Sequence, residues 1–493
     1  MNLLDLVRGC TFDDFLLTPR QGVLPRRDPH AVDLSSPFSR RLTLKRPIVS
    51  ANMDTITRSA MAIVLAEEGG LGVIDRGFRS GDIGPQVTEV AAVKRRQHGV
   101  IADPHTIDRD GRVSDARQVM DRTGVGTLAV VTAGRRFVGL LTERDLRFVS
   151  AGTPIAERMT PLDRLVVHHG AIDLSEAERL MAEHKIKKLP LVAADGTLQG
   201  LVTARDLVKH REHPCATRDA QGRLCVGAAV GATGDYLERA AELRRAGADV
   251  LVIDIAHGHS VVMEKALAAL RQQSDGIDLV AGNVATEAGA TFLVERGADA
   301  IKVGIGPGGG CSTRLTTNFG VPQVEALVRC HLAVGGRVPI IADGGVKRDG
   351  SLVQALLFGG DTVMLGSAFA GTEETPGDVV MRPVVVPESQ KVVPVPFKVF
   401  RGMASLAAMR DRLDLEDAPD QEVQALGAEG LEVSVPARGS ARGVIDDMLK
   451  HLCSAVSYGG ARSLGELRAM FRTEPEAFLI RLSAAARRES FDR

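Results

Sequence analysis

ADAIKVGIGPGGGCSTR, residues 298–314, is the stretch of sequence that decides the fold. It opens with the apolar run ADAIKVG, which is typical of a strand buried on both faces, and passes directly into a glycine-rich loop that carries Cys311. Free cysteine is usually an inert core residue, but a thiol beside glycines, Thr313 and Arg314 is a candidate nucleophile, because nearby backbone amides can hold an anion. This loop therefore predicts a reaction site at the end of a buried strand.

Seven further apolar runs have the same form, and segments of helical periodicity such as YLERAAELRRAGA (236–248) separate them. The runs are PIVSANM (47–53), GLGVID (70–75), LCVGAAVG (224–231), DVLVIDIAHG (249–258), DLVAGNVA (278–285), VPIIADGG (338–345) and DTVMLGS (361–367). This alternation indicates parallel strands buried on both faces. Eight such units predict an α/β fold, a (β/α)8 TIM barrel.

Polar residues of these runs fall at the carboxyl-terminal ends of the strands, where (β/α)8 enzymes place their chemistry. The last two runs end in Asp343-Gly344-Gly345 and Gly366-Ser367. Loops after strands 7 and 8 are a frequent phosphate site of this fold. The sequence therefore predicts a phosphorylated small molecule as the ligand.

Composition favours a large enzyme over a nucleic-acid or membrane-surface protein. Among 493 residues, 61 Lys and Arg offset 62 Asp and Glu, which leaves a net charge of −1 and no basic excess. Six cysteines lie without paired spacing, which favours a reducing compartment over a zinc site or a disulfide framework. The first residues, MNLLDLVRGCTFDD, predict neither a signal peptide nor a membrane span. We expect a cytoplasmic protein.

An insertion with an internal repeat interrupts the barrel pattern. GLLTERDL at 139–146 recurs as GLVTARDL at 200–207, and each copy follows an amphipathic helical segment and a short apolar strand. The polar junctions VKRRQ and HREHP are typical of domain boundaries. The sequence predicts a catalytic barrel in two parts, 1–96 and 213–493, the second including a flap and the C-terminal tail, with an inserted domain at 97–212.

Ordered motifs along nearly the whole chain resemble one family. GIGPGGGCSTR, followed by GVPQ at 320–323, closely resembles the catalytic loop shared by IMP dehydrogenases and GMP reductases. Six more segments are similar to that family, in its order: PIVSANMDT (47–55), GRLCVGAAVG (222–231), VIDIAHGHS (252–260), VAGNVAT (280–286), ADGGV (342–346) and MLGSAFAGTEETPGD (364–378). The resemblance implies an oxidoreductase of purine metabolism that forms a covalent Cys311 adduct at C2 of a purine 5'-monophosphate.

The resemblance also implies the residues that handle the nucleotide substrate. Thr313 and Glu429 resemble the pair that moves protons at C2, although Glu429 by itself would be read as an ordinary surface acid. Asp343 would bind the ribose hydroxyls, glycine amides and Ser367 would hold the phosphate, and the FRGMAS segment would border the base. The implied substrate-binding residues are Ser50, Met53, Gly309, Asp343, Gly345, Gly366, Ser367, Gly402 and Met403.

A dinucleotide site is implied beside the substrate. Asp254, in VIDIAHGHS, would approach the nicotinamide ribose, whereas without the resemblance it is only an acid at a strand end. Asn283 and Gly304 complete the implied cofactor-binding set. We expect NADPH as the cofactor, with NAD+ as the alternative.

The absence of tyrosine from one stretch of sequence indicates which of the family's two reactions to expect. A dehydrogenase of this family oxidises IMP to XMP with NAD+ and hydrolyses the covalent adduct with an Arg–Tyr pair on a mobile flap. Here residues 410–428 contain no tyrosine, and Arg410 and Arg412 lie too early to align with that pair. We therefore expect a GMP reductase, most like those that contain CBS motifs, which forms IMP and ammonia with NADPH. GTEETPGD and AHGHS look more like the dehydrogenase, which stays the alternative.

Two departures from the family pattern leave room for a third interpretation. Gly309 stands where the family usually has Ser, and Phe400 where it often has a phosphate-contacting Tyr. Two hydroxyl contacts to the phosphate are therefore missing, although backbone amides can still bind the anion. A degenerate, nucleotide-sensing binding protein is the second alternative, and the retention of Cys311, Thr313 and Glu429 together argues against it.

The two RDL motifs resemble a tandem pair of CBS motifs, a module that often binds adenosine or guanosine nucleotides. In that module a Thr and an Asp contact the ribose, which implies Thr142, Asp145, Thr203 and Asp206 as a regulatory nucleotide site. Asp145 and Asp206 would equally serve as caps of the helices that follow them. We expect a regulatory purine nucleotide at this pair.

The glycine-rich loop is also similar to the family's potassium site. Carbonyl oxygens of Gly306, Gly308 and Cys311 would bind a monovalent cation, K+, which hard oxygen ligands suit. The family completes this site with the C-terminal segment of a neighbouring subunit, which Glu489 and Ser490 match here. The resemblance therefore implies a homotetramer or octamer. Without the resemblance, the segment ARRES (486–490) would be interpreted as a charged, solvated end of the chain.

Overall fold

The computed structural model divides the chain into two compact units. The described residues are 3–96, 99–101, 103–273, 276–386, 391–413 and 427–491. The first unit spans Met1–Arg95, Cys215–Thr217 and Leu224–Arg493, and the second spans Arg96–Pro214 and Arg218–Arg223. In the described ranges, no helix offers an apolar stretch of the length that a bilayer requires.

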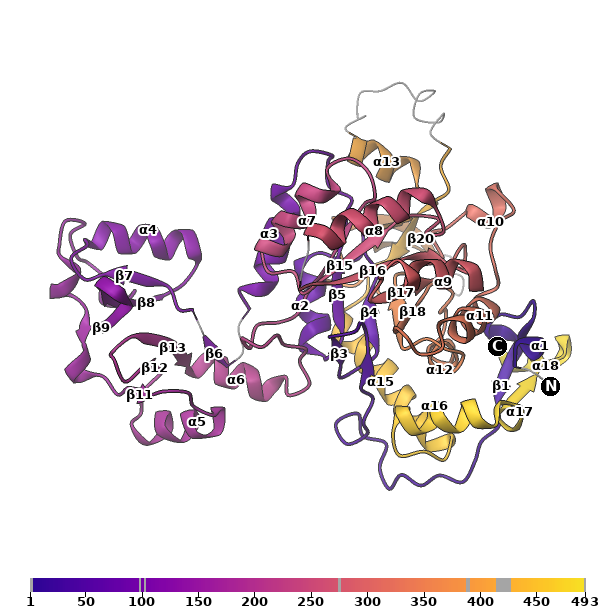
Figure 1. The fold of residues 1–493 in the computed structure, drawn as a ribbon, viewed down its shortest axis with the longest axis horizontal. Coiled ribbons are helices and arrows are strands. Elements are labelled where there is room, and N and C mark those ends of the chain that lie inside the picture. The colour runs from indigo at the N-terminus through magenta and orange to yellow at the C-terminus, as the bar shows by residue number, and fades with distance from the viewer. Residues whose placement is uncertain are drawn as a thin grey trace. The chain divides into compact units, whose positions relative to one another are not determined.

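A closed barrel of parallel strands forms the centre of the first unit (Figure 1). In barrel order, the strands are β14 (Gly227–Val230), β15 (Val250–Asp254), β16 (Asp278–Val284), β17 (Ala300–Val303), β18 (Ile340–Asp343), β19 (Thr362–Leu365), β4 (Ile48–Ser50) and β5 (Leu71–Ile74). The ring closes where Val73 of β5 pairs with Gly227 of β14. Each of the eight predicted apolar runs contains one of these strands, so the predicted (β/α)8 barrel is confirmed.

The period of two along each strand separates two apolar cores. On β15, Val250 and Val252 belong to the core inside the barrel, whereas Leu251 and Ile253 belong to the core between the strands and the helices. Both faces of every strand are therefore covered, which explains the continuous apolar runs of the sequence. Lys302 on β17 departs from this pattern, since it occupies an inward position and is buried.

Helices cover the outside of the barrel (Figure 1). They are α2 (Ser59–Glu67), α3 (Gly84–Lys94), α7 (Tyr236–Arg245), α8 (Val261–Gln273), α9 (Glu287–Glu295), α11 (Gln323–Val334), α12 (Asp349–Leu357) and α15 (Ala441–Tyr458). Side chains cap several of them. The Thr286 hydroxyl accepts a hydrogen bond from the Gly289 amide at the start of α9, and Ser440 accepts one at the start of α15.

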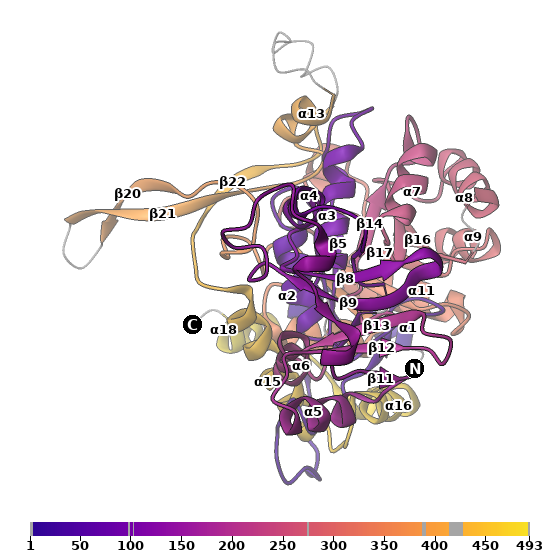
Figure 2. The same cartoon turned by 90° about the vertical axis from the view of Figure 1, so that its left-hand side faces the viewer.

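A three-stranded antiparallel sheet follows the last barrel strand. It consists of β20 (Val380–Val386), β21 (Lys391–Arg401) and β22 (Glu432–Pro436), and Figure 2 shows β20 and β21 extending away from the barrel. β21 ends next to the 402–405 segment, which leads into α13 (Leu406–Leu413). Residues 414–426, most of the predicted flap, lie outside the described residues.

The two ends of the chain pair with each other. β1 (Phe15–Leu17) forms an antiparallel ladder with β23 (Leu479–Arg481), and Arg487 forms an ion pair with Asp14. The predicted tail residues Glu489 and Ser490 lie on the last helix. The remaining elements of this unit are α1 (Leu3–Val7), η1 (Phe12–Asp14), β2 (Ser36–Pro37), β3 (Thr43–Leu44), α10 (Thr313–Thr316), α16 (Leu464–Thr473), α17 (Pro475–Phe478) and α18 (Ala484–Phe491).

The second unit contains one arrangement twice. In each copy the first strand pairs in parallel with the second, which pairs antiparallel with the third. The first copy is β7 (Thr106–Asp108), α4 (Val113–Thr123), β8 (Thr127–Thr132) and β9 (Arg136–Thr142), and the second is β11 (His168–His169), α5 (Leu174–Glu183), β12 (Lys188–Val192) and β13 (Leu198–Thr203). The sheets are completed by β10 (Thr160–Pro161) and β6 (Val100–Ile101), and α6 (Ala204–Glu212) follows β13. The sequence repeat is therefore also a structural repeat.

Candidate active site

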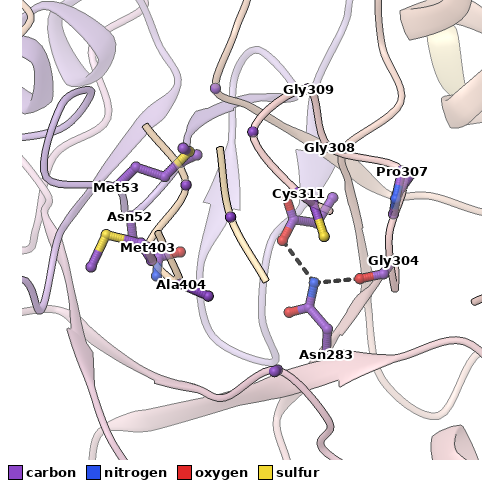
Figure 3. A pocket seen from close by; sticks show the side chains of 18 of the residues that line it. Asn52, Met53, Asn283, Gly304, Pro307, Gly308, Gly309, Cys311, Met403 and Ala404 are labelled. Atoms are coloured by element: carbon purple, nitrogen blue, oxygen red, sulfur yellow. Dashed lines mark hydrogen bonds between the residues drawn. The ribbon is translucent and has the colours of Figure 1, made fainter. Parts of the chain in front are cut away.

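A cavity of about 380 Å³ lies at the carboxyl-terminal ends of the barrel strands (Figure 3). Its wall includes most of the predicted site residues: Met53, Asp254, Asn283, Gly304, Gly306, Gly308, Gly309, Cys311, Thr313, Asp343, Gly345, Gly366, Ser367, Gly402, Met403 and Glu429. The barrel topology brings these residues together because the loops after parallel strands all leave from the same end of the ring.

Cys311, Thr313 and Glu429 form a continuous row of hydrogen bonds. The Cys311 thiol donates to Thr313 Oγ1 at 3.2 Å, and the Thr313 hydroxyl donates to Glu429 Oε2 at 2.7 Å. Although 116 residues separate Glu429 from Thr313, the Ser312 amide fixes its backbone by donating to the Glu429 carbonyl at 2.8 Å. This row can move a proton between the carboxylate and an atom bound at the sulfur.

Glycines allow three segments to approach one another closely around this row. A Cβ atom on Gly402 would overlap the carbonyl oxygen of Gly310, and one on Gly430 would lie 2.5 Å from the Ser405 amide nitrogen. The Leu431 amide donates to the Gly310 carbonyl at 3.0 Å. Only residues without a side chain fit at these contacts, so the glycines decide how closely the glycine-rich loop is covered.

Two carboxylates of the wall share one buried cation. Asp254 ends β15 and Asp343 ends β18, and Lys302 Nζ lies 2.8 Å from Asp254 Oδ1 and 2.7 Å from Asp343 Oδ2. Asn283 Nδ2 donates to Asp343 Oδ2 at 2.9 Å. Burial acts against the charge of Asp254, but Lys302 and then Arg76 outweigh it, so the pKa of Asp254 lies below its ordinary value. Both acids line the cavity, where carboxylate oxygens can accept hydrogen bonds from hydroxyl groups.

The predicted phosphate-binding residues lie together at the ends of β18 and β19. Gly345 has a φ of 81°, a left-handed conformation that favours glycine. A Cβ atom on Gly309 would meet the Ser367 side chain at 3.7 Å, an ordinary contact, so this loop offers an amide where a serine would add a hydroxyl. Phe400 also lines the cavity. Backbone amides and the Ser367 hydroxyl are groups that hold an anion.

Sequence reasoning missed four polar residues of the wall, which are Asn52, Arg76, Lys302 and Arg412. The first three had a local signal, because each is a polar residue within or directly after an apolar run. Arg412 had been excluded as lying too early to match the family's pair, yet α13 places it in the wall. Burial and the charge of Arg76 lower the pKa of Arg412.

Three predicted site residues of the first unit lie outside the cavity wall. Ser50 is fully buried in β4, where its hydroxyl accepts a hydrogen bond from Thr57 Oγ1 at 2.9 Å. Glu489 and Ser490 lie on α18, and Ser490 Oγ donates to the Ala486 carbonyl at 2.7 Å. Within this chain, the structure does not bring the two tail residues to the glycine-rich loop.

The predicted regulatory residues lie in the second unit. Asp145 Oδ2 accepts hydrogen bonds from both the amide and the hydroxyl of Thr142 at 2.7 Å. Thr203 caps α6, and Asp206 lies in the first turn of that helix. Asp206 is therefore an acid of the first turn rather than the cap of α6, and a turn rather than a helix follows Asp145.

The fold and this site define a class of protein, a (β/α)8 enzyme in which a thiol, a hydroxyl and a carboxylate are joined by hydrogen bonds at the carboxyl-terminal ends of the strands. Residues 9–492 match the family model described as "IMP dehydrogenase / GMP reductase domain". The chain belongs to this family.

Relatives from two bacteria carry the first of these two names. A protein named inosine-5'-monophosphate dehydrogenase from Aquifex aeolicus is 40% identical over 486 residues, which cover 98% of this chain and 94% of the relative. A protein of the same name from Streptococcus pyogenes is 43% identical over 471 residues, which cover 94% and 92%.

Solved structures of a Trypanosoma brucei protein carry the second name. A cysteine-to-alanine variant of its GMP reductase, in complex with guanosine 5'-monophosphate, has a TM-score of 0.81 at 36% identity, and the match covers 98% of this chain and 97% of that one. The GMP reductase in complex with guanosine 5'-triphosphate has a TM-score of 0.72 at 33% identity, with 97% and 98% covered. This chain is thus similar to both branches of the family over nearly its whole length.

Proposed function

We propose that the protein is a GMP reductase, which converts GMP, NADPH and two protons into IMP, NADP+ and ammonium. The observation that carries the proposal is the row of Cys311, Thr313 and Glu429 in a cavity whose described wall contains no tyrosine. The row supports covalent chemistry at C2 of a purine. The absence of tyrosine favours reduction of GMP over oxidation of IMP.

In the proposed reaction the Cys311 thiolate attacks C2 of GMP, a C–S bond forms, and the C2–N bond breaks so that the amine leaves as ammonia. Thr313 and Glu429 supply the proton that the leaving amine needs. Hydride from NADPH then adds to C2, the C–S bond breaks, and the sulfur leaves as thiolate. The protein contributes the placement of the sulfur, hydroxyl and carboxylate, and it orients both nucleotides through Asp343 and Asp254.

Oxidation of IMP would require a further step, since water must be activated to hydrolyse the covalent adduct. The dehydrogenases of the family use an Arg–Tyr pair for this step. The only tyrosines of this chain are Tyr236 and Tyr458, and both lie on outer helices, α7 and α15. Loss of ammonia followed by acceptance of hydride needs no water-activating base, which supports the reductase.

IMP dehydrogenase is the second candidate function. Two observations favour it: the relatives from A. aeolicus and S. pyogenes carry that name, and Arg412 lies in the cavity wall. The chain nevertheless offers no tyrosine partner in that segment.

Absorbance at 340 nm distinguishes these functions. We expect the signal to fall with GMP plus NADPH and to stay constant with IMP plus NAD+. A rise in the second assay contradicts the reductase and supports the dehydrogenase. Binding of nucleotides without turnover in either assay would indicate the nucleotide-sensing protein instead.

Cys311→Ala tests the covalent step. We expect turnover to be abolished while the Kd for GMP stays within about tenfold, because the ribose and phosphate contacts lie elsewhere. Cys215→Ala is the matched control, since this half-buried cysteine lies outside the cavity wall. Turnover retained by Cys311→Ala would remove the central step of the mechanism.

We also propose that K+ binds carbonyl oxygens of the glycine-rich loop. The Gly308 carbonyl accepts a hydrogen bond from the Cys311 amide at 3.1 Å, and its second lone pair fits a hard cation. Gly306 and Cys311 would add two further carbonyls, and Glu489 and Ser490 of a neighbouring subunit in a homotetramer or octamer would complete the site. Activity in KCl should then exceed activity in NaCl, and removal of residues 486–493 should abolish the difference.

A further inference from the structure

Lys302 is a charged residue at an inward position of an otherwise apolar strand. Its neighbours on β17 are Ala300, Ile301 and Val303, all fully buried, and Lys302 itself is 2% exposed. A buried lysine is strongly unfavourable unless its charge is compensated, so its partners decide whether the strand tolerates it.

The partners of Lys302 come from two other strands. Its Nζ bridges Asp254 on β15 and Asp343 on β18 at 2.8 and 2.7 Å. Burial lowers the pKa of Lys302, but the two carboxylates outweigh this effect, so its pKa lies above the ordinary value. Arg76 is 3.7 Å from Asp254, and Asn283 donates to Asp343. Lys302 is therefore a cation held between the two acids that end these strands.

We propose that Lys302 is a positioning residue that orients both ribose-binding carboxylates and thereby links the monophosphate subsite with the dinucleotide subsite. The inference rests on the proposed function in one respect, that Asp343 binds the ribose of the purine nucleotide and Asp254 that of the nicotinamide. The inference applies to reduction of GMP and to oxidation of IMP. In both reactions a purine monophosphate and a nicotinamide dinucleotide bring the same two riboses to the site.

Removal of the cation changes both acids at once. In Lys302→Met, two half-buried carboxylates face each other without their shared partner, so they repel each other or one of them takes up a proton. Each acid then loses the fixed geometry in which it accepts hydrogen bonds from ribose hydroxyls. In contrast, Asp343→Asn and Asp254→Asn each alter one subsite and leave one carboxylate paired with Lys302.

The test measures equilibrium binding in the Cys311→Ala background, which excludes turnover. GMP and IMP are titrated alone, and NADPH and NAD+ are titrated with the monophosphate at saturation. We expect Lys302→Met to raise the Kd of a monophosphate and of a dinucleotide by about tenfold or more each. Asp343→Asn should raise mainly the first Kd, and Asp254→Asn mainly the second.

Lys94→Met is the matched control, because Lys94 is also a buried lysine of the barrel unit and pairs with Asp249 at 2.9 Å away from the cavity wall. It should lower the melting temperature and leave both Kd values unchanged. Lys302→Arg keeps the charge and should restore part of the binding lost in Lys302→Met.

An effect of Lys302→Met on the melting temperature alone, or on one nucleotide alone, overturns the proposal. If Lys302→Met does not fold, Lys302→Arg is the variant that tests the proposal. The arginine side chain places its charge differently, so both Kd values should rise at least about threefold. Unchanged Kd values overturn the proposal. Failure of the proposed function is recognised separately, because it appears as turnover of IMP with NAD+ in the protein that retains Lys302.

Discussion

Asp75 carries a carboxyl group that is completely buried directly after β5. Burial raises its pKa to about 6, and the charge of Asp54 adds to this effect, while Arg58 and the Gly77 amide act in the opposite direction. Arg58 Nε lies 3.3 Å from Asp75 Oδ2, and the Gly77 amide donates to Asp75 Oδ1 at 2.6 Å. The carboxyl group therefore lies beside the cavity wall in surroundings that disfavour its charged form.

Asp75→Asn should make stability less dependent on pH. Because the pKa of Asp75 is about 6 in the folded protein and 3.8 otherwise, the folded state binds this proton more tightly. The resulting stabilisation is complete below pH 3.8 and is lost as the pH rises to about 6, an effect of ~3 kcal/mol. The melting temperature of Asp75→Asn relative to the unsubstituted protein should thus rise between pH 4 and pH 6.5, as measured by calorimetry.

Asp378→Asn is the control for this measurement, since Asp378 is exposed. Its difference in melting temperature from the unsubstituted protein should stay constant over the same range. A constant difference for Asp75→Asn as well would show that Asp75 titrates with an ordinary pKa in the folded protein.

At the scale of the elements, the three-stranded sheet brings two segments over the catalytic loop. β21 and β22 pair as far as Arg401 and Glu432, so the 402–405 and 429–431 segments leave the sheet side by side. Gly402 lies against Gly310, and the Gly402 amide donates to the Leu431 carbonyl at 3.0 Å. The sheet thereby holds Glu429 at Thr313.

Gly402→Ala should separate these segments. The added methyl group would overlap the Gly310 carbonyl oxygen, so the end of β21 must move and the row from Cys311 to Glu429 loses its alignment. We expect kcat to fall by about tenfold or more, with a small change in melting temperature. Gly443→Ala on α15 is the control, because its methyl group would meet no atom within 4 Å and should leave kcat unchanged. An unchanged kcat in Gly402→Ala would show that this close approach is not required.

At the scale of the whole molecule, the apolar cores of the two units share no residue. The clusters of buried residues in the barrel unit lie outside 97–212, and the three clusters of the second unit lie between Val100 and Leu207. All eight barrel strands also lie outside 97–212. Each unit therefore has its own core, which is the condition for independent folding.

Replacement of residues 97–212 by a short linker should leave a folded barrel with catalytic activity. We propose that the second unit binds a regulatory purine nucleotide, because each of its two matching copies ends in a hydrogen-bonded Thr–Asp pair, Thr142 with Asp145 and Thr203 with Asp206. ATP or GTP should then change the kinetics or the assembly of the full-length protein but not of the truncated one. An identical response in both forms would place the effect at the active site and remove the role assigned to Asp145 and Asp206.

The sequence by itself determined the barrel, because strands covered on both faces must be apolar throughout and a strand's polar residues gather where it ends. These are local constraints, so the eight runs and the loop that carries Cys311 could be recognised from neighbouring residues. The resemblance to one family then suggested Glu429, for which the residues around it offered no physical signal. The proposed direction of the reaction likewise rests on which residue types a segment contains.

The tertiary structure alone decided which of these residues meet. Lys302 finds Asp254 and Asp343 only because the ring closes with β15, β17 and β18 in a fixed register. Arg412 enters the cavity wall through the path of α13, although its position in the sequence does not align with the family's Arg–Tyr pair. Pairing across a barrel depends on strand order, register and closure, which are properties of the whole chain. A pattern of neighbouring residues therefore identifies the strands and their ends but does not specify the partners that each charged side chain acquires.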